Sequence, residues 1–168
     1  MIDPQALDRV GRYLSLRGSG VQVKAYLGGG TDGDVWETSI GTAAKAFRSE
    51  RGYFNERDCY QRLADFGVTE ELDGFRIPEM HGWDDQLMVV EMDLMQHPPY
   101  IIDFAKVRID RPPDFSREVL QQFEAEGSEL FDENWPTVKS LLAALESFQI
   151  YYLDPKPHNI VFPPRDPD

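Results

Sequence analysis

The chain has 168 residues, of which 41% are hydrophobic and 28% charged, values typical of one folded domain rather than a disordered chain. Its formal net charge of −13 disfavours general binding to nucleic acids and to membranes, because both surfaces are anionic. The single cysteine, Cys59, excludes an internal disulfide and a thiolate zinc cluster, and no apolar run reaches the roughly 18 residues that span a bilayer. We therefore expect a cytoplasmic protein.

The first part of the chain predicts a helix followed by an antiparallel meander of strands. Asp3 is a suitable N-cap for a helix over 4–16, whose apolar residues share one face. Apolar and polar residues then alternate over 21–27, which predicts a half-buried strand. This strand runs into the segment GGGTDG, and two more strands are expected at 35–38 and 42–47.

The later part of the chain predicts two further strands and then helices. The segment LMVVEM is the most apolar in the sequence and predicts a central strand. Five strands with one helix after the third, followed by helices, indicate an α+β architecture. The later elements are expected as a helix over 53–66, strands over 75–83 and 86–92, an irregular connection over 97–113, a helix over 115–131 broken near Gly127, a helix from about 136, and a final loop with a short strand.

The segment GGGTDGDV matches the pattern G-x-G-x-x-G-x-V through Gly28, Gly30, Gly33 and Val35. Glycines in such a loop let the backbone approach phosphate groups closely and direct N–H groups toward them. The dinucleotide-binding fingerprint has similar glycines but must precede a helix, whereas a strand is expected here. The pattern therefore favours a phosphate-covering loop between two strands; the alternative is a glycine-rich hairpin turn.

A lysine and a glutamate follow the glycine segment at positions that suit an ion pair. Ala43 and Lys45 lie two apart on one strand, so both face the same side, and an ammonium group there can bind nucleotide phosphates. Glu56, on the next helix, could hold Lys45 in position. The alternatives are a surface lysine on an edge strand and a solvated glutamate, and Glu50 is a rival partner.

The segment DPKPHN places Asp154, Lys156 and Asn159 between a long amphipathic helix and a short apolar strand. Asp154 could accept a proton from an attacking hydroxyl, Asn159 could bind magnesium, and Lys156 could stabilise charge on a transferred phosphoryl group. The alternative is a proline-rich turn with solvated polar residues. The position of this segment favours the catalytic interpretation.

Together these motifs, from about residue 21 to 162, resemble the protein-kinase-like superfamily of serine/threonine kinases. The resemblance implies one kinase-like unit over 1–168: an N-terminal helix in 1–18, a five-stranded antiparallel N-lobe sheet with one αC-type helix in 19–95, and a reduced helical C-lobe with the catalytic loop in 96–168. It implies these roles: Gly28, Gly30 and Gly33 at the phosphates of ATP, Val35 and Ala43 around adenine, Lys45 and Glu56 as an ion pair, backbone groups of Glu91 and Asp93 at the adenine edge, Asp154, Lys156 and Lys45 in catalysis, and Asn159 as a Mg²⁺ ligand.

The sequence departs from the family in two places. Tyr152 and Leu153 replace the H-R of the H-R-D motif, and no D-F-G follows Asn159, where the only later carboxylates are Asp166 and Asp168. The rest of the helical lobe is also missing, as expected either for a minimal kinase-like protein or for a fragment. Two functions stay open: an ATP- and Mg²⁺-dependent phosphotransferase acting on a protein or small-molecule hydroxyl, and a pseudokinase that binds nucleotide or scaffolds a protein partner or homo-oligomer.

Overall fold

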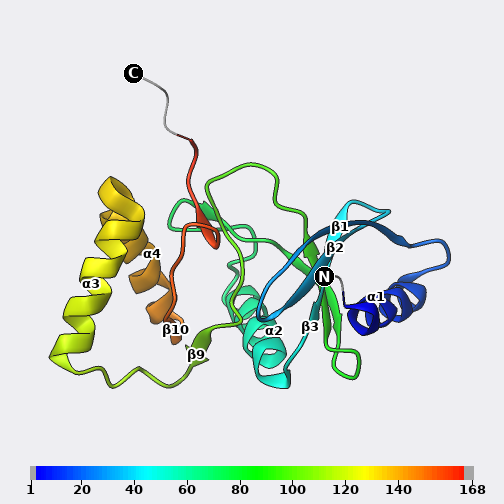
Figure 1. The fold of residues 1–168 in the computed structure, drawn as a ribbon, viewed down its shortest axis with the longest axis horizontal. Helices are drawn as coiled ribbons and strands as arrows, with labels where there is room; N and C mark the ends of the chain where they lie inside the picture. Colours follow the sequence, from blue (N-terminus) through cyan, green and yellow to red (C-terminus); the bar gives the residue numbers. More distant parts are fainter. Residues whose placement is uncertain (1–2, 165–168) are drawn as a thin grey trace.

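A computed structural model describes residues 3–164, in which a five-stranded antiparallel sheet organises the N-terminal half of the chain (Figure 1). This sheet and the helices that follow it confirm the predicted α+β architecture. Its strand order is β1-β2-β3-β7-β6, with β1 at Val23–Gly29, β2 at Gly33–Thr38, β3 at Thr42–Phe47, β6 at Met80–Asp84 and β7 at Val89–Asp93.

The strand expected over 75–83 is wrong as a single element. Residues Phe75–Arg76 form β5, which belongs to a different sheet with β4 (Glu71–Leu72), and β6 begins only at Met80. Pro78 lies between β5 and β6, and it has no backbone N–H to donate to a neighbouring strand. The proline therefore separates two strands that the apolar pattern joins.

Helix α1 (Pro4–Arg17), which was predicted at nearly these bounds, covers one face of the five-stranded sheet. Its buried residues share a hydrophobic cluster with Trp36 and Val89 from the sheet. Arg9 fastens the helix by donating from its guanidinium to the carbonyl oxygens of Leu87 (2.8 Å) and Phe47 (2.7 Å). In Figure 1, α1 lies at the opposite end of the molecule from the C-terminal helices.

Helix α2 (Glu50–Asp65) packs on the other face of the sheet. Ser49 caps it, because its hydroxyl oxygen accepts from the N–H of Gly52. Leu63 of α2 belongs to a large core that also contains Val90 from the sheet and Leu145 from the C-terminal part of the chain. This core joins the two halves of the protein.

The C-terminal half contains α3 (Arg117–Phe131), a 3₁₀ turn η1 (Asp132–Asn134) and α4 (Trp135–Ser147). The break expected near Gly127 is wrong, since α3 continues through this residue. A Cβ atom at position 127 would lie 2.3 Å from the Trp135 ring, so this glycine lets the helix approach the tryptophan closely. None of the helices within residues 3–164 combines the length and apolar character needed to cross a membrane.

The region expected to be an irregular connection contains two short strands that pair with distant parts of the chain. Strand β8 (Tyr100–Ile101) pairs antiparallel with β11 (Ile160–Val161), and β9 (Val107–Ile109) pairs antiparallel with β10 (Ile150–Tyr152). The two pairings bring the loop after β8 against the loop between β10 and β11. These are the segments that carry Asp103 and Asp154.

Candidate functional site

The predicted ion pair between Lys45 and Glu56 lies in the interior of the structure. Lys45 comes from β3 and Glu56 from α2, and Lys45 Nζ lies 2.6 Å from Glu56 Oε2. The lysine side chain is 10% exposed and the glutamate side chain 1% exposed. The rival partner, Glu50, lies exposed in the first turn of α2, so it does not compete for the ammonium group.

A third charged residue, Asp103, joins this pair, although sequence analysis did not single it out. Its Oδ1 atom lies 3.1 Å from Lys45 Nζ and also accepts a hydrogen bond from the N–H of Ala105 (3.2 Å). Asp103 adopts a φ of 71°, a left-handed conformation that is uncommon for any residue with a side chain. The available signal was the triplet Asp103-Phe104-Ala105 after a short apolar segment, but the family pattern places D-F-G after Asn159.

One ammonium group and two carboxylates make this cluster electrostatically unbalanced. Burial raises the pKa of Glu56 to about 7, against the opposing effect of Lys45, and the Asp103 charge adds to the rise. Burial also disfavours charge on Lys45, yet Glu56 and Asp103 outweigh it and raise the lysine pKa. For Asp103, burial is outweighed by Lys45, which lowers the pKa of that carboxyl. Glu56 is therefore the member of the cluster that most readily takes up a proton.

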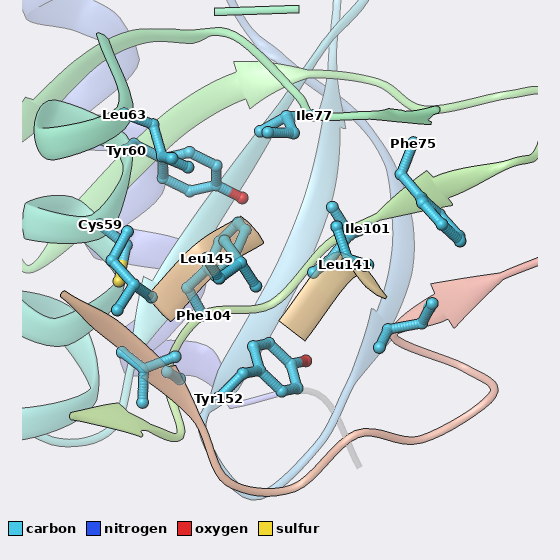
Figure 2. Packing of buried hydrophobic residues seen from close by; sticks show 14 of the residues in the cluster. Cys59, Tyr60, Leu63, Phe75, Ile77, Ile101, Phe104, Leu141, Leu145 and Tyr152 are labelled. Carbon is cyan, nitrogen blue, oxygen red and sulfur yellow. The ribbon is translucent and has the colours of Figure 1, made fainter. Parts of the chain in front are cut away.

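A row of three aromatic side chains holds the surrounding elements together (Figure 2). Phe104 packs edge-on against Tyr60 of α2, with ring centroids 5.2 Å apart, and edge-on against Tyr152 of β10, at 6.0 Å. The Tyr152 hydroxyl donates to the backbone oxygen of Asp103 at 2.9 Å. These contacts couple the helix that carries Glu56 to the loop that carries Asp103 and to the strand that precedes Asp154.

The predicted catalytic segment lies beside the Asp103 loop. Asn159 is buried, and its backbone oxygen accepts from the N–H of Ile102 at 2.9 Å, so it is adjacent to the residue that precedes Asp103. Asp154 Oδ2 lies 3.2 Å from Lys156 Nζ and 3.2 Å from the Nζ atom of Lys106. The predicted trio of Asp154, Lys156 and Asn159 therefore borders the segment that follows β8.

The glycine segment forms the strand, turn and strand that its pattern predicts. Its turn is closed by a hydrogen bond from the N–H of Gly30 to the oxygen of Gly33 (2.9 Å). A Cβ atom on Gly33 would lie 2.4 Å from the carbonyl oxygen of Ala46, whereas a Cβ atom on Gly30 would meet nothing within 4 Å. The sheet itself requires Gly33, while the space above Gly30 is open. Gly28 lies within β1, before the turn.

Val35 and Ala43 lie on the face of the sheet that also carries Lys45. Val35 on β2 lies directly opposite Lys45 on β3. Ala43, two residues before Lys45 on the same strand, lies directly opposite Met92 on β7. Both Val35 and Ala43 contact the core that joins the two halves of the protein. The structure thus brings together the side chains that the family resemblance assigns to adenine and to phosphate.

Glu91 and Asp93 are engaged within the sheet. The Glu91 carboxylate points toward α1, where it accepts from Arg17 Nε at 2.7 Å and from the Tyr13 hydroxyl at 3.0 Å. The Asp93 N–H donates to the carbonyl oxygen of Glu79 at 3.0 Å. The contact of Glu91 and Asp93 with an adenine edge stays a prediction. While its hydrogen bond to Glu79 is kept, the Asp93 N–H is not available to an adenine.

The donor set around Asp103 suits a metal ion bound together with a phosphate ligand. Within residues 3–164, no three His, Cys, Asp or Glu side chains gather into a metal cage. Asp103 and Asn159 offer one carboxylate and one amide oxygen from adjacent segments. Mg²⁺ commonly takes only one or two protein carboxylates and completes its shell with phosphate oxygens and water. The residues present therefore fit a magnesium–nucleotide complex.

A hollow of about 820 Å³ lies away from this site, between α2 and β9. Arg51, Arg62 and Arg108 are among the residues that line it, whereas Lys45 and Asp154 are not. We place the candidate site at the buried ion cluster because perturbed ionisable groups and convergent polar residues mark functional sites more specifically than volume does.

No family model matches the sequence, and no curated protein matches it. Among solved structures, the chain is similar to one in the streptomycin-ATP-APH(2")-IIa ternary complex, with a TM-score of 0.41 and 13% sequence identity. The match covers 85% of this chain and 40% of that chain, so the present protein spans less than half the length of its structural neighbour.

Proposed function

We propose that this protein is a kinase-like phosphotransferase that binds ATP with Mg²⁺ and transfers the terminal phosphoryl group to a hydroxyl. The observation that carries the proposal is the meeting of two distant groups of residues. The cluster around Lys45 and Asp103 is joined to the loop from Asp154 to Asn159 by the pairings of β8 with β11 and of β9 with β10. A solvated surface lysine and a simple proline-rich turn, the two alternatives, do not explain why these residues lie together.

Lys45 would bind the phosphates of ATP, held in place by Glu56 on α2. A buried ammonium group with a fixed carboxylate partner is preorganised, so it loses little freedom when a phosphate arrives. The open turn at Gly30 would cover the phosphates, and Val35 and Ala43 would contact the adenine. Asp103 and Asn159 are the residues that would hold Mg²⁺, which neutralises phosphate charge when bound.

Asp154 would act as the proton acceptor. It takes the proton of the acceptor hydroxyl as that oxygen forms a bond to the terminal phosphorus, and the bond from phosphorus to the bridging oxygen of ADP breaks. ADP then leaves with the electron pair of the broken bond. Lys156, 3.2 Å from Asp154, would stabilise the negative charge on the transferred group.

The order of these parts along the chain differs from that of protein kinases. There the D-F-G aspartate follows the catalytic loop, whereas the Asp103-Phe104-Ala105 segment precedes Asp154 by about fifty residues. We propose that Asp103 takes the role of the D-F-G aspartate. In this interpretation the missing motif is supplied from an earlier point in the sequence.

The first test is a thermal-shift titration with ATP, with and without Mg²⁺, on the wild type and on Asp103→Asn. A ligand that binds only the folded state at one hundred times its Kd stabilises it by about 2.7 kcal/mol. We expect a magnesium-dependent rise in Tm that the variant largely loses. Wild-type protein that is folded but shows no shift at millimolar ATP would exclude nucleotide binding and leave a scaffolding role.

Turnover is measured separately, as ADP formation by wild type and by Asp154→Asn. We expect the variant to bind Mg-ATP at least as well as the wild type but to form ADP at least about a hundredfold more slowly, because the proton acceptor is lost. Binding without ADP formation in the wild type, with water and candidate hydroxyl acceptors present, would favour the pseudokinase alternative.

A further inference from the structure

Lys106 is a charged residue beside Asp154 that neither the sequence motifs nor the proposed function uses. It follows Asp103-Phe104-Ala105 directly and precedes β9, and its side chain is 47% exposed. Its Nζ atom lies 3.2 Å from Asp154 Oδ2, the same oxygen that lies 3.2 Å from Lys156 Nζ. Two ammonium groups thus share one carboxylate oxygen, so Lys106 can leave it for another anion while Lys156 stays paired.

Three acidic residues from separate segments act on the ammonium group of Lys106. Its hydrogen bond with Asp154 is the main reason why the pKa of Lys106 is raised, and the charges of Asp32 and Asp103 contribute to the rise. Asp32 lies in the glycine turn, Asp103 in the loop after β8, and Asp154 in the catalytic segment. The contact with Asp154 places the Lys106 ammonium group at the segment proposed to hold the proton acceptor, beside the site where the terminal phosphate of ATP would lie.

Lys45 and Lys106 differ in how freely their side chains can move. Lys45 is buried between Glu56 and Asp103, so its position is fixed. Lys106 is half exposed and makes an ion pair of the kind that contributes little to stability, so it can exchange its partner at low cost. A terminal phosphate carries more negative charge than one carboxylate and offers more acceptor oxygens.

We propose that Lys106 binds the terminal phosphate of ATP in this site, an inference that rests on the proposed function. In the nucleotide-free protein its ammonium group is paired with Asp154. When ATP binds, the ammonium group moves to the terminal phosphate. The Asp154 carboxylate then keeps Lys156 as its one ammonium partner and accepts the proton of the hydroxyl acceptor more readily. Lys106 therefore links nucleotide occupancy to the availability of the base.

Isothermal titration calorimetry with two nucleotides tests this role, because ADP lacks the phosphate that Lys106 would contact. The ligands are the magnesium complexes of ADP and of an ATP analogue with a non-hydrolysable bond between the last two phosphates. We expect Lys106→Ala to weaken binding of the analogue about tenfold, as for loss of one charge-assisted hydrogen bond, and ADP binding by less than about twofold. Lys106→Arg should keep most of the affinity for the analogue.

The control is Lys139→Ala, because Lys139 is a similarly exposed lysine, paired with Glu124 on the surface. It should change neither affinity. Lys106→Gln, which keeps most of the aliphatic stem, serves as a second variant if the alanine variant is poorly folded. Equal losses for both nucleotides, or no loss for either, would overturn the role of Lys106 while nucleotide binding stands. If the wild type binds neither nucleotide, the proposed function fails and the role of Lys106 fails with it.

Discussion

Replacing Lys45 by methionine removes the ammonium group between two carboxylates while keeping a side chain of similar length. Removing one partner of a buried ion pair generally costs about 3–5 kcal/mol, because the remaining charge is left in the interior. Asp103 is one-quarter exposed and can recover some hydration, whereas Glu56 is 1% exposed. We therefore expect the lower end of this range, about 3 kcal/mol of unfolding free energy, at pH 8.

The cost should depend on pH because Glu56 can take up a proton. Burial raises the pKa of Glu56 to about 7 in the wild type, above the value of 4.5 for an unperturbed group. A carboxyl group with a raised folded-state pKa contributes stability that is present at low pH and lost as pH rises through that pKa. Without Lys45 the pKa of Glu56 rises further, so the variant goes on losing stability as the pH rises above 7. The penalty should be larger at pH 8 than at pH 6 by about 1.4 kcal/mol.

Urea unfolding of wild type and Lys45→Met at pH 6 and pH 8 measures both quantities. Lys24→Met is the matched control, because Lys24 pairs with Glu37 at the surface and is 62% exposed. It should cost less than about 0.5 kcal/mol at either pH. A pH-independent penalty for Lys45→Met would refute proton uptake by Glu56. An equal penalty in the control would refute the argument from burial.

Two further predictions concern the same region. Asp103→Asn should lower the pKa of Glu56, because it removes a neighbouring negative charge. A carboxyl-carbon NMR titration of Glu56 would show this as a midpoint below about 7. An unchanged midpoint would mean that the two carboxyl groups do not interact. Gly33→Ala should lower the free energy of unfolding in urea by about 2 kcal/mol, since its Cβ atom would lie 2.4 Å from the Ala46 oxygen. Gly30→Ala, whose Cβ atom would have nothing within 4 Å, should lower it by less than about 0.5 kcal/mol. Equal costs would refute this explanation.

The main sheet could be predicted because its strands carry their own pattern. Alternation over 21–27 and the apolar segment that ends at Met92 place two of its strands within a few residues of where they lie. The half-buried character expected for the first strand is wrong, because β1 lies at the edge of the sheet and most of its residues, Ala25 and Leu27 among them, are exposed. The short strand β11 was also expected, from the apolar residues after Asn159, but β8, β9 and β10 could not be predicted in this way. Each has only two or three residues, too few to show a period, and each exists because a distant segment pairs with it.

The candidate site was predictable to the extent that its residues depend on local spacing. Lys45 and Glu56 follow from a strand and the next helix, and the structure places them 2.6 Å apart. Asp103 gains its position through tertiary contacts with Lys45 and Tyr152, which no spacing along the chain reveals. Asp166 and Asp168, the carboxylates considered in its place, lie outside the described residues.

The residues of the candidate site come from two separate parts of the chain. The connection between β9 and α3, residues 110–116, separates two sets of functional groups. Lys45, Asp103 and Lys106 precede it, and Asp154 and Asn159 follow it. The strands that carry each set also find their partners in the other, since β8 and β9 pair with β11 and β10. If the chain were divided in this connection, each of the two polypeptides would hold half of the proposed active centre. Phosphoryl transfer, where it occurs, would then report that the two halves have associated.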